Sequence, residues 1–349
     1  MFKSSPTLRA LGTCPSQPGT TWRQELARAF SNVSDLLTAL ELDPDMVGVQ
    51  DDVLKTFPLR VPRGYVSRMR KRDIEDPLLR QVLPIADEAR IVSGYKLDPV
   101  GDLNSARGPG ILQKYRGRVL LIVTGACGIH CRYCFRRAYP YHEASVNSGQ
   151  IEAVMRMLNS DRSVEEVILS GGDPLSLSNE RLEILLQALG RVSHLKRIRI
   201  HTRLPVVLPE RIDSGLVAAL SRVVKPLIFV LHFNHANEID TPTAEAITAL
   251  SNHTFMLLNQ AVLLRGVNDT VTDLVALSER LFDIGVSPYY LHQLDPVQGA
   301  AHFQVGDYRA RKLIGAAAAL LPGYLVPRLV RENPGGSAKE LMAPVQTSD

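Results

Sequence analysis

The sequence between residues 119 and 291 alternates short apolar runs with segments of helical periodicity, and this alternation limits the possible folds more than any other feature. The apolar runs favour strands, and they lie at 119–124, 167–169, 197–202, 227–231, 255–258 and 289–291. Helical patterns separate them, at about 147–159, 179–190, 210–223, 243–251 and 271–284. Strands that alternate with helices form parallel sheets. The pattern predicts an α/β fold in which six β/α units make a partial, TIM-like (β/α)6 barrel.

Polar or glycine-rich residues follow each predicted strand directly. Cysteines follow the first strand, and the later strands end at Ser170-Gly171-Gly172-Asp173-Pro174, Arg203, His232, Gln260 and His292. In barrels and open α/β sheets, ligands bind at the carboxyl ends of the strands. The sequence therefore predicts the functional site at this end of the sheet.

Composition and periodicity divide the chain into four parts: a loose arm at 1–20, a helical N-terminal region at 21–110, the barrel at 111–325 and a C-terminal segment at 326–349. The arm is rich in Ser, Thr, Pro and Gly. The N-terminal region is predicted to open with an amphipathic helix over 22–42, which Asp43-Pro44 ends.

The composition is that of an ordinary globular protein. Of the 349 residues, 45% are hydrophobic and 22% are charged, and the net charge is +4. No apolar run reaches the length that spans a bilayer, and we find no targeting signal. The basic run 68–72 is followed at once by Asp73, Glu75 and Asp76, which favours a solvated face over a nucleic-acid site. We expect a cytoplasmic protein with no membrane partner and no direct nucleic-acid partner.

Three of the four cysteines lie within eight residues, as Cys127-x3-Cys131-x2-Cys134, with Tyr133 before the last of them. Three thiolates can hold three irons of a cubane cluster and leave the fourth iron without a protein ligand. An electron-transfer cluster normally takes four cysteines. The spacing therefore indicates a [4Fe–4S] cluster whose open iron binds another molecule.

Two simpler interpretations of these cysteines compete with the cluster. A disulfide framework is disfavoured, because three cysteines in eight residues are an odd set and no secretory signal is seen. A structural zinc site with His130 or His142 as the fourth ligand stays open, although zinc ligands normally come as two separated pairs.

Two further sequence features carry chemistry but are weakly specific alone. Gly171 and Gly172 let a ligand approach the backbone closely, yet an ordinary βα turn has the same composition. Lys339 follows the glycine turn 334–337. A solvated lysine is the simpler interpretation, and a covalent link to the aldehyde of pyridoxal phosphate (PLP) is the chemical one.

Taken together, these features resemble the lysine 2,3-aminomutase family of radical S-adenosylmethionine (SAM) enzymes over most of the chain. Besides the cysteine motif with Arg136-Arg137, the resemblance is carried by 57–64 (FPLRVPRG), 76–84 (DPLLRQVLP), 114–121 (KYRGRVLL), 170–175 (SGGDPL), 203–209 (RLPVVLP), 232–238 (HFNHANE), 259–269 (NQAVLLRGVND) and 288–291 (PYYL). The resemblance implies a radical SAM barrel and an isomerase that uses a [4Fe–4S] cluster, SAM and PLP. In that family SAM binds the open iron and is cleaved to a 5′-deoxyadenosyl radical.

The resemblance also implies a role for each candidate residue. The cluster is held by Cys127, Cys131 and Cys134; SAM is lined by Gly171, Gly172 and Asp173, with further contacts from Arg203, His232 and Gln260; PLP is linked to Lys339, with its phosphate on Tyr115 and Arg118; the substrate carboxylate binds Arg136, and the distal ammonium of lysine binds Asp295 and Glu332.

Two departures from the free-lysine mutases bear on the substrate. Glu332 stands where that family has a shorter acid, and the sequence ends ten residues after Lys339. This ending and the stretch 297–303 (VQGAAHF) are similar to the bacterial branch that makes (R)-β-lysine for the modification of translation elongation factor P.

The resemblance implies L-lysine as substrate, an electron donor such as a flavodoxin or ferredoxin, and a functional link to elongation factor P and its lysyl ligase. One alternative is a family member that acts on another amino acid such as glutamate, whose distal carboxylate calls for a cation instead of Asp295 and Glu332. The other is a non-catalytic Fe–S module, which needs neither Lys339 nor the turn that contains Gly171 and Gly172.

Overall fold

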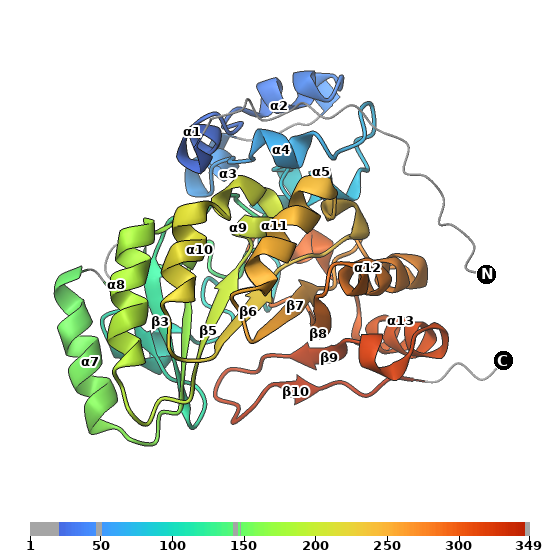
Figure 1. The fold of residues 1–349 in the computed structure, drawn as a ribbon. Coiled ribbons are helices and arrows are strands. Elements are labelled where there is room, and N and C mark those ends of the chain that lie inside the picture. The colour runs from blue at the N-terminus through green and yellow to red at the C-terminus, as the bar shows by residue number, and fades with distance from the viewer. Residues whose placement is uncertain (1–20, 47–50, 142–145, 147, 346–349) are drawn as a thin grey trace, which may run out of the picture.

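The computed structural model describes residues 21–46, 51–141, 146 and 148–345, so the predicted arm with Cys14, and His142, lie outside the described residues. The described strands form one sheet in the order β1 to β10 (Figure 1). Strands β3 to β9 are parallel, and antiparallel pairs extend the sheet at both edges. The strands are β1 (Ala106–Gly108), β2 (Ile111–Leu112), β3 (Arg118–Thr124), β4 (Glu166–Gly171), β5 (Arg197–Thr202), β6 (Leu227–Leu231), β7 (Met256–Val262), β8 (Ser287–His292), β9 (Arg328–Arg331) and β10 (Glu340–Leu341).

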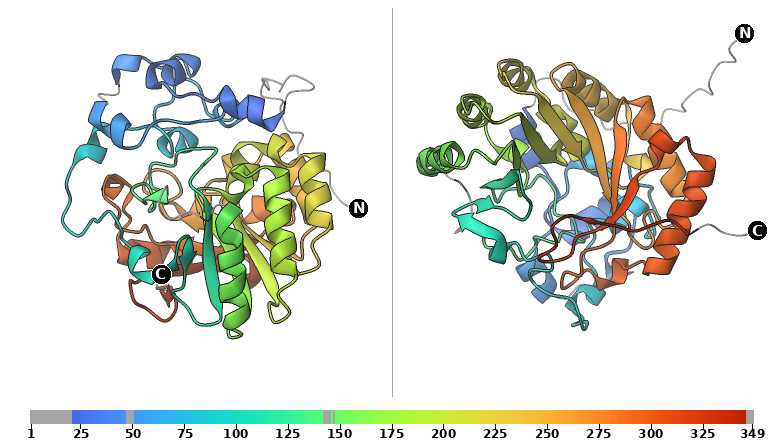
Figure 2. Two further views of the ribbon diagram at one scale, coloured as in Figure 1. Left: turned by 90° about the vertical axis from the view of Figure 1, so that its left-hand side faces the viewer. Right: turned by 90° about the horizontal axis from the view of Figure 1, so that it is seen from below.

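A helix follows each strand from β3 to β8, and these helices surround the curved sheet (Figure 2). They are α7 (Ile151–Ser160), α8 (Asn179–Gly190), α10 (Ser214–Ser221), α11 (Thr241–Ser251), α12 (Val271–Asp283) and α13 (Asp307–Leu320). Polar caps start several of them: Ser178 accepts a hydrogen bond from the N–H of Arg181, for example. The predicted partial barrel of six β/α units is confirmed, and β9 adds a further parallel strand. In the described part of the chain, no helix combines the length and apolar content needed to cross a bilayer.

The alternation of β5 shows how the sequence separates the core from the barrel interior. Ile198 and Ile200 are fully buried on the side of the strand that faces the helices. Arg199 and His201, which point to the opposite face because side chains alternate along a strand, line the cavity inside the barrel. The apolar side of β5 thus builds the core, and its polar side is directed at the site.

The N-terminal region lies across the end of the barrel where the strands finish (Figure 1). Its helices are α1 (Trp22–Ala27), α2 (Val33–Ala39), α3 (Asp51–Thr56), α4 (Arg63–Val66) and α5 (Pro77–Arg80). Its backbone meets the cysteine loop directly: the N–H of His130 donates to the carbonyl of Arg60, and that of Arg132 donates to the carbonyl of Gln81.

The prediction of one helix over 22–42 is wrong. The chain leaves helical geometry after α1, because Phe30 forms a two-way backbone bridge with Val61 across the region. Asn32 then caps a second helix by accepting hydrogen bonds from the N–H groups of Ser34 and Asp35. The apolar spacing continues across the break, so periodicity alone does not reveal it.

The C-terminal segment folds back on itself as a β9–β10 hairpin. In the antiparallel register Glu340 pairs with Arg331. Glu332 directly follows β9 and Lys339 directly precedes β10, so the hairpin brings these two residues together although seven positions separate them.

Candidate active site

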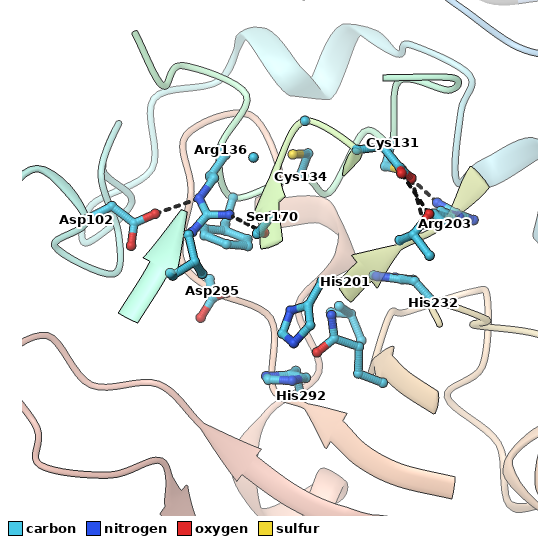
Figure 3. Close-up of a pocket in the computed structure, with 18 of the residues that line it drawn as sticks. Asp102, Cys131, Cys134, Arg136, Ser170, His201, Arg203, His232, His292 and Asp295 are labelled. Carbon is cyan, nitrogen blue, oxygen red and sulfur yellow. Dashed lines mark hydrogen bonds and ion pairs between the residues drawn. The ribbon is translucent and has the colours of Figure 1, made fainter. Parts of the chain in front are cut away.

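One cavity of about 650 Å³ lies at the carboxyl ends of the parallel strands. Every residue that the sequence assigns to the cluster, SAM, PLP or the substrate lines this cavity. In Figure 3, Cys131 and Arg203 lie to one side of it, Asp102 and Asp295 lie to the other, and His201 lies between them. The site therefore gathers residues from both edges of the sheet: the cysteines follow β3, and Lys339 belongs to the hairpin.

The three cysteines lie half-buried on one loop after β3, as free thiols. In the described residues, no three His, Cys, Asp or Glu side chains converge as ligands of a single ion. A cubane takes one thiolate per iron, so its cysteines stand apart, whereas a zinc ion needs its ligands around one point. The donor set fits a [4Fe–4S] cluster better than zinc. The ring of His130 is also occupied, because its Nδ1 lies 2.8 Å from the carbonyl oxygen of Pro58.

Burial makes the cysteine loop a poor place for a bare thiolate. Burial, followed by the charge of Cys131, raises the pKa of Cys134 to about 11. Burial likewise raises the pKa of Cys127. Bound iron supplies the positive charge that such thiolates lack, which is the usual reason that metal-ligating thiols lose their protons.

The two glycines after β4 allow the strand end to touch the cysteine loop. Gly171 has φ +127°, and a Cβ placed on it would lie 2.4 Å from the carbonyl oxygen of Thr124. A Cβ on Gly172 would lie 2.4 Å from the carbonyl oxygen of Ala126. These contacts leave no room for a side chain. The turn after β4 and the cysteine loop therefore pack backbone against backbone.

Asp173 lies in the cavity wall, but its carboxylate already binds protein groups. One oxygen accepts hydrogen bonds from the N–H of Leu175 and the hydroxyl of Thr202, and the other accepts from the N–H groups of Arg203 and Leu204. A carboxylate has about four lone-pair positions. Asp173 therefore ties the end of β4 to the end of β5.

His232, which follows β6, and Gln260, which lies in β7, complete this half of the cavity. The Nε2 atom of His232 lies 3.1 Å from the hydroxyl of Tyr133, the aromatic residue of the cysteine motif. Burial, and then the charge of Arg203, lower the pKa of His232 to about 3, so its imidazole is neutral. Gln260 lines the same wall from β7.

An alternating chain of charges occupies the other half of the cavity. Arg136 donates to one oxygen of Asp102 at 2.6 Å, and Lys114 lies 2.7 Å from the other. Lys114 also donates to Glu332 at 2.8 Å, and Lys339 contacts the second oxygen of Glu332. Asp102 and Lys114 are not among the predicted site residues, because only the folded chain brings them into contact with Arg136 and Glu332.

The two predicted substrate acids differ in charge state. Burial raises the pKa of Glu332, but the charges of Lys339 and Lys114 outweigh this and bring it down to about 2. Burial, and then the negative charge of Glu332, raise the pKa of Asp295 to about 7. Glu332 is thus ionised in the free protein, and Asp295 is poised between its two forms near neutral pH.

Cationic and aromatic side chains line a further part of the cavity. The guanidinium of Arg118 lies 4.7 Å from the ring centre of Tyr115, and Arg199 donates to Glu166 at 2.6 Å. His201 carries a buried Nε2 atom that has no hydrogen-bond partner among the described residues. Burial, and then Arg199, lower its pKa, so this ring is neutral. A cation, hydroxyls, an amine and a free imidazole nitrogen fit a phosphorylated aldehyde such as PLP.

Known proteins match part of the barrel and, separately, most of the chain. The Radical SAM superfamily model matches residues 121–223. The L-lysine 2,3-aminomutase of Escherichia coli is 44% identical over 319 residues, covering 91% of this chain and 93% of the relative. That of Haemophilus influenzae is 41% identical, covering 92% and 95%, and that of Clostridium subterminale is 32% identical, covering 93% and 78%.

Among solved structures, the radical SAM methyltransferase TsrM from Kitasatospora setae aligns only loosely, with a TM-score of 0.37 and 11% identity over 59% of this chain and 43% of that one. The sequence relatives are decisive, because they cover nearly all of the chain at far higher identity. Radical SAM enzymes use a [4Fe–4S] cluster and SAM, and in this chain the three cysteines, Gly171 and Gly172 line one cavity. The chain belongs to the lysine 2,3-aminomutase family of radical SAM isomerases.

Proposed function

We propose that this protein converts L-lysine to (R)-β-lysine by moving the amino group from carbon 2 to carbon 3, with PLP linked to Lys339. The observation that carries the proposal is that Lys339, Glu332 and Asp295 line the same cavity as the three cysteines. A candidate radical source, an amine for an aldehyde and an acidic pair are thus within reach of one small substrate.

The reaction explains why more than one cofactor is needed. When bound, the cofactors supply a radical that removes the unreactive hydrogen of carbon 3 and a π bond through which nitrogen passes from carbon 2. No side chain is basic enough to remove that hydrogen as a proton. The tasks left to the protein are to bind the substrate, orient it and exclude water.

The charge chain supports lysine as the substrate. Glu332 contacts two cations, Lys114 and Lys339. The distal ammonium of lysine brings a further positive charge to this acidic pair, because Asp295 offers it a second carboxylate beside Glu332. A glutamate substrate brings a carboxylate against both acids, which is unfavourable in a buried site.

The opposite end of the substrate is assigned to Arg136. This buried guanidinium donates to Asp102 at 2.6 Å and to the hydroxyl of Ser170 at 3.0 Å. Two fixed partners hold the planar group in one orientation, which suits it to bind a carboxylate. The distance between Arg136 and the acidic pair would then select the length of the amino acid.

We also propose that the enzyme acts in the cytoplasm and that its product serves to modify translation elongation factor P. A flavodoxin or ferredoxin is the proposed electron donor for the aminomutase. The similarity of residues 297–303 to the branch that makes (R)-β-lysine for this modification supports the proposed use of the product. Reductive cleavage of SAM consumes one electron from outside the protein, which calls for a low-potential donor.

The test is a turnover assay with the reconstituted enzyme. Protein carrying iron and PLP is reduced without oxygen and incubated with SAM and either L-lysine or L-glutamate. We expect 5′-deoxyadenosine and (R)-β-lysine, identified by chiral chromatography, from the lysine sample alone. Formation of β-glutamate instead would replace the proposed substrate, and the absence of any amino shift, with SAM still cleaved, would refute the mutase.

A further inference from the structure

We infer that Arg203 serves the iron–sulfur cluster and not SAM: its guanidinium donates a hydrogen bond to the Cys131 thiolate and raises the reduction potential of the cluster. The inference rests on the radical SAM family of the chain and on no property of PLP or lysine. It replaces the SAM-binding role that the sequence assigns to this residue.

The fold places the Arg203 side chain against the cysteine loop. Arg203 directly follows β5, and its backbone N–H donates to Asp173 at 2.7 Å, which fixes the start of the side chain beside the cysteine loop. Its Nη1 atom lies 2.7 Å from the Sγ atom of Cys131 and also donates to the hydroxyl of Tyr133 (Figure 3). Arg203 therefore touches a cluster ligand and the aromatic residue of the same motif.

The guanidinium of Arg203 is also fixed by hydrogen bonds on the side away from Cys131. Its Nη2 atom donates to Glu238 and to the side-chain oxygen of Gln81, both at 2.7 Å. Glu238 is itself fixed, because its other oxygen accepts from the backbone N–H groups of Asn234 and His235. These anchors aim Nη1 at the sulfur without any help from solvent or ligand.

One buried hydrogen-bond donor of Arg203 is unsatisfied among the described residues. The Arg203 side chain is 7% exposed, and its Nε–H has no hydrogen-bond partner among the described residues. A buried donor without an acceptor costs free energy, which a bound group can recover. The sulfur atoms of a cluster are such acceptors, so a cluster bound within reach of Nε would satisfy this donor.

The direction of the effect follows from charge. Reduction adds one electron to the cluster and releases no proton, and the electron comes from an external low-potential donor. The more negative cluster is stabilised more by a nearby positive donor, especially in a buried site with little screening. Hydrogen bonds to cluster sulfurs and local charge are established determinants of such potentials. Arg203 favours reduction, while Glu238, on its far side, opposes it.

The experiment measures the cluster potential by redox titration with electron paramagnetic resonance, without SAM and without substrate. We expect Arg203→Gln to lower the equilibrium constant for reduction at least tenfold, which is about 59 mV for one electron. Glu238→Gln removes the opposing charge and should shift the potential in the other direction. Arg203→Lys keeps the charge but loses the two-sided anchor, so an intermediate value is expected.

Arg68→Gln is the matched control. Arg68 is another buried arginine beside Glu238, and it donates to the backbone oxygens of Glu238 and Val206 instead of to sulfur. Its loss should leave the potential near that of the wild type. Iron and sulfide are quantified in every variant, so that only proteins with full clusters are compared.

The result that overturns the inference is an unchanged potential in Arg203→Gln with a full cluster. Weaker SAM binding together with that unchanged potential would return Arg203 to the SAM site. If Arg203→Gln does not assemble a cluster, the Glu238→Gln and Arg203→Lys variants decide. Shifts of the same sign in these two, or no shift in either, would refute the electrostatic role.

Discussion

Lys339 and Lys114 bind opposite oxygens of the same Glu332 carboxylate, so a single acid links the hairpin lysine to the strand side of the cavity. The sequence places Lys339 seven residues from Glu332 and Lys114 more than two hundred residues away. The arrangement gives the cavity a fixed order of alternating charges that runs from Arg136 to Lys339.

Replacing Lys339 should separate the PLP site from the cluster site. We expect Lys339→Ala to lose the visible absorbance of linked PLP and all amino-shift activity, because no other amine is assigned to the aldehyde. The brown cluster absorbance and the iron content should stay at the wild-type level. A full PLP absorbance band in Lys339→Ala would disprove the assignment.

Shortening or neutralising Glu332 should affect substrate binding. Glu332→Gln breaks the ion pair with Lys114, which keeps only Asp102 as a carboxylate partner, and removes one acid from the proposed ammonium site. We expect kcat/KM for lysine to fall by about 10²-fold, or about 3 kcal/mol, which is typical of breaking a buried ion pair. Glu332→Asp keeps the charge and should lose less. Steady-state kinetics of the two variants, each loaded with cofactors, make the comparison.

The pKa of Asp295 leads to a prediction about stability. Burial and Glu332 raise this pKa from its ordinary value of 3.8 to about 7 in the folded protein. A raised pKa means that the folded state binds the proton more tightly, so the contribution of Asp295 to stability is greatest below pH 4 and is lost as the pH rises toward 7. Asp295→Asn has no charge to bury, so it should be the more stable protein at pH 8, by roughly a few kcal/mol at most. Urea unfolding at pH 8 and pH 5 tests this, and an advantage that grows at pH 5 would contradict it.

Removing one cysteine of the motif should abolish the cluster. We expect Cys131→Ala to lose most of its iron and all reductive cleavage of SAM, because each thiolate holds one iron. Cys14→Ser is the control, since Cys14 is the one cysteine outside the motif. Iron analysis and the yield of 5′-deoxyadenosine decide, and a Cys131→Ala protein that still cleaves SAM would refute the assignment.

A single methyl group on Gly171 should disturb both the fold and the cluster loop. At φ +127° an alanine is strained, and its Cβ would lie 2.4 Å from the Thr124 oxygen. We expect a loss of about 2–4 kcal/mol in unfolding free energy and a lower iron content. Gly64→Ala is the control, because a methyl group added there would meet no atom within 4 Å and the φ of Gly64 is not positive. Equal effects of the two substitutions would argue against the tight contact.

The sequence predicts the barrel well because its strands carry strong local patterns. β5 and β6 occupy 197–202 and 227–231 in both the prediction and the structure. The break between α1 and α2 escapes prediction, since it depends on the bridge between Phe30 and Val61, which are distant in sequence. Local spacing reports what a segment can form alone, and long-range pairing decides where it stops.

The candidate site is predicted less completely, for the same reason. The cysteine motif and Lys339 can be identified from sequence because their residue types are tied to specific chemistry. Asp102 and Lys114 look like ordinary surface charges until the fold places them 2.7 Å apart in the cavity. The sequence puts Arg203 at the correct strand end, but which molecule it would serve depends on its contact with Cys131, which no spacing rule describes.

The cysteine loop and the β9–β10 hairpin lie near opposite edges of a sheet whose strands are ordered linearly, yet both line one cavity. The curvature of the sheet, and not a flexible linker, therefore brings the cysteine loop and the hairpin to the same cavity. Each intervening strand pair contributes a small rotation to that curvature. Substitutions in the packed core that change strand twist should alter the distance between the cysteine loop and Lys339 while leaving every predicted cofactor ligand intact. The curvature of the barrel thus sets the spacing between the two halves of the site.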